Sequence, residues 1–172
     1  MTGDLEFLSS YLNISVGKLS NDSNTPVLTV KNGVKYSGLI TIARYLASQS
    51  KQKDQLLGTT IESQAEISQW LEYRTTQVDR CAEKRDVELI LEELNKHLAN
   101  KAFFVDNTPT LADLLLYLGL YVVFSNLTFY EKQKYLNVSR WFDHVQNISR
   151  TKKAMKKKLA FQRNLLYSGN SH

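Results

Sequence analysis

The feature that most constrains the fold is a run of apolar residues near the middle of the chain, LLLYLGLYVVF. It follows Thr110-Leu-Ala-Asp113, in which Thr110 can cap a helix and Asp113 can reach back to the Thr110 amide, so both have a predicted structural role. A helix over Leu111–Phe124 would be apolar on nearly every face, and other elements must surround such a helix. Because the run is shorter than the about 20 residues that span a bilayer, it predicts the central helix of a globular domain and no membrane span.

The rest of the C-terminal half has the spacing of apolar residues that is typical of helices. Further helices are predicted at Ile61–Arg80, Arg85–Ala99, Thr128–Tyr135, Val138–Asn147 and Lys152–Ala160. Residues 60–168 are therefore expected to form an all-α lobe, followed by a tail at 169–172.

The N-terminal part predicts a smaller lobe of mixed structure over residues 1–50. Leucines recur at helical spacing in residues 4–12, and the turn-forming residues of 13–24 predict a loop. Two β-type runs then flank Asn32-Gly33, a pair that favours the tight turn of a hairpin. A helix is predicted at Leu39–Ala47, and the polar residues after it predict a linker at 51–59.

The composition bears on the cellular compartment, on possible partners and on possible metal or catalytic sites. The single cysteine, Cys81, cannot form an intramolecular disulfide, and the N-terminus lacks the pattern of a signal peptide, so a reducing compartment is expected. The net charge of +5 slightly favours nucleic acid or acidic proteins as partners. None of the three histidines stands at a metal-ligand spacing, so neither a metal nor a cofactor is predicted. Cys81 beside Arg80 could have a lowered pKa, yet it sits where a helix should end, and catalysis there is not favoured.

Three longer segments resemble a known family. They are WLEYRTTQVD at 70–79, TLADLLLYLGL at 110–120 and EKQKYLNVSRWFDHVQ at 131–146, and the similarity extends from the hairpin TPVLTVKNG to RNLLY near the C-terminus. The family is that of elongation factor one epsilon, also called multifunctional protein three of the aminoacyl-tRNA synthetase complex. The resemblance implies an α+β, mostly α fold that is glutathione-transferase-like, with a shortened thioredoxin-like N-terminal lobe and an all-α C-terminal lobe.

The resemblance also implies a function. The chain would be a non-catalytic scaffold in the cytoplasm that bridges the transferase-like domains of methionyl-tRNA synthetase and glutamyl-prolyl-tRNA synthetase in translation. A nuclear role in the DNA-damage response, with checkpoint kinases as partners, is suggested by resemblance alone. The alternatives are a residual glutathione-dependent enzyme and a tRNA-binding module whose lysine run, Lys152–Lys158, contacts phosphates. That run is also interpretable as a nuclear import signal or a solvated helix face.

The residues argue against a glutathione-dependent enzyme. Such an enzyme has an acidic or amide residue before a serine at its third helix, whereas this chain has Tyr36 before Ser37. The hydroxyl-bearing residues 9–11 lie in a helical pattern, and too few residues precede Pro26 for a complete βαβ unit. The resemblance implies a cis bond before Pro26, although trans is the general preference of such bonds.

The resemblance places partner contacts on two surfaces. The first is the transferase-type dimer face, and its residues would be Leu39, Ile42, Arg44, Tyr45, Trp70, Tyr73 and Arg74. Trp, Tyr and Arg are enriched among interface anchors. Trp70 could instead pack between the lobes, whereas Arg74 is expected at the surface because arginine is seldom buried unless it is paired.

The second surface is the start of the helix at 138–147. Asn137 is predicted to cap this helix, and Arg140 is predicted to project toward a partner as a bidentate donor. An intramolecular salt bridge with Asp143 is the alternative for Arg140. Trp141 is expected in the core.

Overall fold

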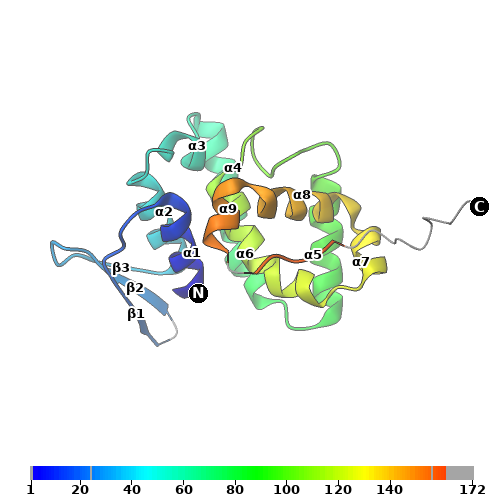
Figure 1. Ribbon diagram of the computed structural model, residues 1–172, viewed down its shortest axis with the longest axis horizontal. Helices are drawn as coiled ribbons and strands as arrows, with labels where there is room; N and C mark the ends of the chain where they lie inside the picture. The colour runs from blue at the N-terminus through cyan, green and yellow to red at the C-terminus, as the bar shows by residue number, and fades with distance from the viewer. Residues whose placement is uncertain (1, 24, 156, 162–172) are drawn as a thin grey trace, which may run out of the picture.

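The computed structural model describes residues 2–23, 25–155 and 157–161. Two groups of elements lie side by side in it (Figure 1). The smaller group consists of α1 (Thr2–Leu12), β1 (Lys18–Asp22), β2 (Thr25–Thr29), β3 (Lys35–Ser37) and α2 (Leu39–Ser48). The larger group is helical and consists of α3 (Lys53–Leu57), α4 (Ile61–Thr76), the 3-10 turn η1 (Val78–Arg80), α5 (Lys84–His97), α6 (Leu111–Asn126), α7 (Phe129–Lys134), α8 (Leu136–Asn147) and α9 (Ser149–Ala154). The predicted α+β, mostly α class is confirmed.

The predicted hairpin is present. β2 and β3 pair antiparallel with Leu28 opposite Tyr36, and the Val30 amide donates to the Val34 carbonyl at 3.0 Å across the turn. Gly33 has a φ of 81°, a conformation that glycine adopts without strain. Leu28 is fully buried, so the face of the sheet that carries its side chain packs against the core.

A third strand, β1, lies where the sequence predicts a loop. It pairs antiparallel with β2 and places Leu19 opposite Leu28. Four of its five residues are exposed, so the strand lacks the alternation of apolar and polar residues by which strands are recognised. Residues 18–22 form a strand because their backbone pairs with β2, and their amino-acid composition does not predict this pairing.

Pro26 follows a trans bond, so the cis bond implied by the resemblance is wrong; no cis peptide bond occurs within the described ranges. Pro26 lies buried in β2 opposite Asn21, and its carbonyl accepts a 2.9 Å hydrogen bond from the Gly38 amide. An extended trans backbone continues the strand through this residue, and trans is also the favoured form of such bonds.

The predicted central helix is confirmed in α6. Its buried residues lie on all sides of the helix: Leu111, Ala112, Asp113, Leu114, Leu115, Leu116, Tyr117, Leu120 and Phe124. α6 contacts α1 and α2 of the smaller group and α4 and α8 of the larger one, so one hydrophobic core runs through both (Figure 1). Within residues 2–23, 25–155 and 157–161, no helix is long and apolar enough to cross a membrane.

The segment predicted as a linker contains α3. Leu56 is fully buried, and α3 contacts α2, α4 and α6. Burial of Leu56 packs this short helix onto the core, and a single leucine among polar residues does not predict such packing. The lobe boundaries at residues 50 and 60 stay predictions.

The last predicted helix is shorter than expected, because α9 ends at Ala154. Residues 157–161, which we call the C-terminal strap, instead cross the helical group as an extended trace (Figure 1). Gln146 holds the strap from α8: its Nε2 donates to the Leu159 carbonyl at 3.0 Å, and the Leu159 amide donates to its Oε1 at 3.2 Å. The Phe161 ring packs against Phe142. The tail predicted at 169–172 lies outside the described residues.

Candidate partner-binding surfaces

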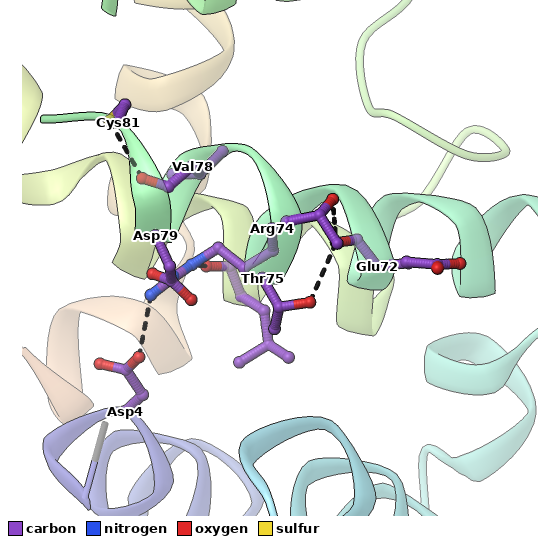
Figure 2. A network of polar contacts seen from close by, with 9 residues as sticks. Asp4, Glu72, Arg74, Thr75, Val78, Asp79 and Cys81 are labelled. Atoms are coloured by element: carbon purple, nitrogen blue, oxygen red, sulfur yellow. Dashed lines mark hydrogen bonds and ion pairs between the residues drawn. The ribbon is translucent and has the colours of Figure 1, made fainter. Parts of the chain in front are cut away.

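Arg74 lies inside the protein, so its expected place at a partner surface is wrong. The residue is 4% exposed, and its guanidinium pairs with Asp4 of α1, 3.0 Å from Nη2 to Oδ2, and with Asp79 of η1. Its Nε donates to the Leu115 carbonyl of α6 at 3.0 Å. Figure 2 shows the guanidinium between the two carboxylates. Two charged partners compensate the burial of this arginine, which joins four elements.

Gly119 makes room for this network. It lies in the apolar run of α6, where α4 and α6 pack closely. A Cβ at this position would overlap Nε of Arg74. The glycine therefore allows the arginine side chain to reach the backbone of α6.

Trp70 packs inside the chain, although not between the lobes as the alternative interpretation held. It is 7% exposed, and its ring lies 5.3 Å from that of Tyr73, 4.6 Å from that of His97 and 4.7 Å from that of Phe104, centroid to centroid. These neighbours belong to the helical group, so the indole packs within it and not between the lobes. A partner contact through Trp70 does not fit this burial.

Of the other predicted dimer-face residues, Leu39 and Ile42 are buried, whereas Arg44 is exposed and Tyr45 and Tyr73 are half-buried. Arg44 bonds to the Ser68 hydroxyl of α4 and so bridges α2 and α4. Tyr45 stacks on Tyr36 of β3 with 4.6 Å between the ring centroids. The Tyr73 hydroxyl donates to Glu93 of α5 at 2.7 Å, so this ring faces α5 and not α2.

Two apolar residues on the helices next to α2 were missed by sequence reasoning. Ile61 at the start of α4 is 82% exposed, and Leu57 at the end of α3 is half-buried. Leu57 and Gln64 line a hollow of about 700 Å³ together with Arg44 and Tyr45. The sequence does contain a sign of this exposure, because Ile61 lies outside the stripe of apolar residues that α4 turns toward the core. We define the α2–α4 face as Arg44, Tyr45, Leu57, Ile61, Gln64 and Ser68.

Arg140 is exposed at the second predicted surface, and it is tied to α5. One of its guanidinium nitrogens, Nη2, donates to the carbonyls of Leu98 and Lys101 at 2.9 and 3.1 Å. The alternative salt bridge with Asp143 is not found within the described part of the chain. A hollow of about 380 Å³ opens beside these groups. We define the α5–α8 face as the wall residues Asn100, Lys101, Arg140 and His144.

Asn95, and not Asn137, caps α8. Its side-chain oxygen accepts hydrogen bonds from the amides of Asn137 and Val138 at 2.9 and 3.3 Å. The Asn137 side chain donates back to the Asn95 carbonyl at 3.1 Å. The predicted cap is wrong because α8 already begins at Leu136, and the free amides of its first turn are satisfied from α5.

Asp113 has the structural role that the sequence predicts. Its Oδ2 accepts from the Thr110 amide and hydroxyl, both at 2.9 Å, and its Oδ1 accepts from the Phe104 amide at 3.0 Å and the Trp141 indole at 2.9 Å. Burial raises the pKa of Asp113, and these four hydrogen bonds oppose the rise. Trp141 is 1% exposed, as expected for a core residue.

Of the residues considered for catalysis, Ser9, Tyr36 and Cys81 are engaged in the fold. The Ser9 hydroxyl donates to the Glu6 carbonyl within α1 at 2.7 Å, and the ring of Tyr36, before Ser37, stacks on Tyr45. Burial raises the pKa of the Cys81 thiol, which donates to the Val78 carbonyl at 3.0 Å, so the lowered pKa considered for this cysteine is wrong. Among the described residues no group of His, Cys, Asp and Glu could hold a metal ion.

The lysine run does not form one helix face. Lys152 and Lys153 are exposed on α9, whereas Lys157 and Lys158 belong to the strap. The Lys157 carbonyl accepts from the Tyr121 hydroxyl at 2.9 Å. The interpretation as a single solvated helix face is therefore wrong.

Comparison with known proteins identifies the family. Residues 63–149 match the family model described as nuclear-export cofactor Arc1p. The human eukaryotic translation elongation factor 1 epsilon-1 is 42% identical to this chain, over 98% of the chain and 97% of the human protein. The chain belongs to the elongation factor 1 epsilon-1 family. The predicted resemblance is thus confirmed.

The similarity of this elongation factor 1 epsilon-1 family member extends to a synthetase. The bifunctional glutamate/proline–tRNA ligase of Cricetulus griseus is 32% identical over 121 residues, which are 70% of this chain and 8% of that protein. A glutathione S-transferase-like protein from Lodderomyces elongisporus matches with a TM-score of 0.75 at 15% identity, over 92% of this chain and 91% of that one. The predicted glutathione-transferase-like fold is confirmed by this match.

Proposed function

We propose that this protein is a non-catalytic adaptor of the aminoacyl-tRNA synthetase complex. One of its two faces binds the transferase-like domain of methionyl-tRNA synthetase, and the other binds that of glutamyl-prolyl-tRNA synthetase. The observation that carries the proposal is the presence of two separate accessible faces, centred on Arg44 and Arg140, in a chain that belongs to the elongation factor 1 epsilon-1 family.

The composition of the α2–α4 face supports a protein partner. Arg44 is an exposed planar donor, and Ile61, which shares a face of α4 with Gln64 and Ser68, is 82% exposed. Arginine and aromatic anchors next to an apolar contact are typical of interface centres. The hollow of about 700 Å³ can receive a side chain from the partner. This face is smaller than predicted because Leu39, Ile42, Trp70 and Arg74 lie in the core and Tyr73 faces α5.

The α5–α8 face supports a second, independent contact. Arg140 is already held by two backbone carbonyls, so its position is fixed before a partner arrives. A fixed side chain loses less conformational entropy on binding than a free one. Because Arg140 also ties α8 to the end of α5, its loss would disturb Asn100 and Lys101 of the same face.

The identity with a glutamate/proline–tRNA ligase supports the choice of one partner. A domain that resembles this chain could pair with it through the matching helix faces. The engagement of Tyr36 and Ser9 within the fold supports a chain without glutathione chemistry. The proposed localisation is cytoplasmic, and a nuclear role with checkpoint kinases rests on the family resemblance alone.

Pull-down of the purified chain with the two isolated synthetase domains, separately and together, tests the proposal. A ternary complex is expected with the unchanged chain. Ile61→Glu should abolish binding of one domain, and Arg140→Ala should weaken binding of the other about tenfold or more, as for the loss of a charge-assisted hydrogen bond. Arg85→Ala is the matched control, because Arg85 is an exposed arginine outside both faces.

Two results would contradict the proposal. Binding of neither domain by the folded chain would remove the adaptor function. Loss of both domains in Arg140→Ala, with an unchanged circular dichroism spectrum, would show that the two contacts are not separate.

A further inference from the structure

A basic hollow lies where α1, the loop after α2 and α9 meet. It encloses about 610 Å³, a volume typical of small-molecule sites. Its walls contain three cations, Lys51, Arg150 and Lys153, and no carboxylate side chain. No residue of this hollow belongs to the α2–α4 or the α5–α8 face.

The three cations lack a negative partner. Within the described ranges no ion pair joins them to a carboxylate, and the remaining residues of the chain contain no Asp or Glu. Among the residues that the structure describes, Arg150 makes a side-chain hydrogen bond to a neutral amide oxygen, that of Gln52, and this bond joins α9 to the loop after α2. Like charges gathered around one hollow raise the local positive potential and attract anions.

Several of the carbonyls at the ends of α1 and α2 that could attract these cations are already hydrogen-bonded. A helix C-terminus attracts positive charge through its free carbonyls. Here the Ser9 and Ser10 carbonyls of α1 accept from the amides of Ile14 and Asn13, and the Ala47 carbonyl of α2 accepts from Ser50. These carbonyls are therefore already satisfied by the backbone.

Tyr11 provides the second observation. It lines the hollow and is only 4% exposed, and its hydroxyl makes no hydrogen bond to any residue that the structure describes. Burial raises the pKa of Tyr11 whereas the nearby charge of Arg150 lowers it, so the hydroxyl keeps its proton at neutral pH and can donate it to a ligand oxygen.

We propose that this hollow binds a small anion of the phosphate class. Arg150, Lys51 and Lys153 neutralise its charge, and the Tyr11 hydroxyl donates a hydrogen bond to one of its oxygens. An arginine fork beside lysines is suited to a phosphate group. Since α1 and the loop belong to the smaller group of elements and α9 to the larger, the bound anion would join the two.

Isothermal titration calorimetry with pyrophosphate at low salt, on the full chain, tests this site. The unchanged chain should bind, and Arg150→Gln and Lys153→Gln should each weaken binding about tenfold or more. Lys152→Gln is the matched control, because Lys152 is the exposed neighbour of Lys153 on α9 and does not line the hollow. Tyr11→Phe should weaken binding while the unfolding temperature of the free protein stays the same.

Three outcomes would overturn the proposal. One is the absence of binding by the folded, unchanged chain at millimolar pyrophosphate. Another is equal weakening by Lys152→Gln and Lys153→Gln, which would show that only net charge matters. The third is binding of tRNA phosphates that is indifferent to Arg150→Gln while pyrophosphate fails to compete, since the phosphates would then lie elsewhere.

Discussion

Nη2 of Arg74 lies 3.0 Å from Oδ2 of Asp4, and this ion pair joins residues 70 positions apart in the sequence. Asp4 belongs to the first helix of the chain and Arg74 to the helical lobe, so the pair connects the two groups of elements. Asp79 and the Leu115 carbonyl complete the surroundings of the guanidinium. These two carboxylates and the carbonyl explain how an arginine can stand in the core.

Replacement of Gly119 by alanine tests how tightly this network is packed. The added methyl group would overlap the Arg74 side chain, so Gly119→Ala should lower the free energy of unfolding by about 1–3 kcal/mol. Urea denaturation measures the change. Gly3→Ala is the control, since a Cβ at Gly3 in α1 meets nothing within 4 Å, and it should leave stability unchanged or slightly raised. Equal effects of the two changes would contradict the packing argument.

Asp113→Asn should be strongly destabilising although it changes one atom. The amide group would place an N–H against donors that now face a carboxylate oxygen, and a buried donor without an acceptor costs about 1–3 kcal/mol. Thermal and urea unfolding would measure the loss. Glu131→Gln is the control, because Glu131 occupies the same position in the exposed capping box of α7 and should cost less. Similar losses at both positions would show that burial is not the cause.

The capping box of α7 should make stability depend on pH. The Thr128 amide and hydroxyl both donate to Glu131 at 2.8 Å, and these hydrogen bonds, helped by Lys84, lower the pKa of Glu131. A carboxyl whose pKa is lower in the folded state stabilises the fold above its unfolded pKa, and this contribution is lost as the pH falls through the folded pKa. The difference in unfolding free energy between the unchanged chain and Glu131→Gln should therefore be present at pH 7, and it should decrease as the pH falls below the unfolded pKa of about 4.3 and through the lower folded pKa. A difference that is the same at all pH values would contradict this assignment.

Gln146 should control access to the C-terminal strap. Gln146→Ala removes both hydrogen bonds to Leu159, so the strap should open more often and trypsin should cut after Lys157 and Lys158 several times faster. Mass spectrometry of a limited digest identifies these cuts. Gln69→Ala, on the exposed side of α4, should leave the digest unchanged. An unchanged rate in Gln146→Ala would show that ring packing alone holds the strap.

The elements that the sequence predicts correctly are those that rest on local chemistry. The hairpin depends on Asn32-Gly33, and the start of α6 depends on Thr110 and Asp113 three residues apart. The apolar run after this cap predicts a central position because no face of the helix can meet water. The family resemblance adds the arrangement of the two lobes, which the match to transferase-like structures confirms.

The partner surfaces were harder to predict than the fold. The resemblance nominates a helix face but does not tell which of its side chains turn inward, and four of its members, Leu39, Ile42, Trp70 and Arg74, lie in the core. Arg44 and Arg140 do stand at the surface, each bonded to a neighbouring helix or to the loop after it. Ile61 was missed because a single apolar residue outside the buried stripe of its helix does not by itself indicate a partner contact.

The sequence by itself therefore determined most of the helices, the hairpin, the capped central helix and the family, because each depends on residues close together in the chain or on the whole pattern of motifs. Only the tertiary structure decided that Arg74 is buried between Asp4 and Asp79, that Asn95 caps α8 and that the strap leaves the helix at Ala154. In each of these cases a group from a distant part of the chain, or from another element, satisfies a charge or a free backbone amide or carbonyl. When folding brings such a group next to a residue, the sequence around that residue does not reveal it. Burial and capping at these residues therefore follow from the packed structure alone.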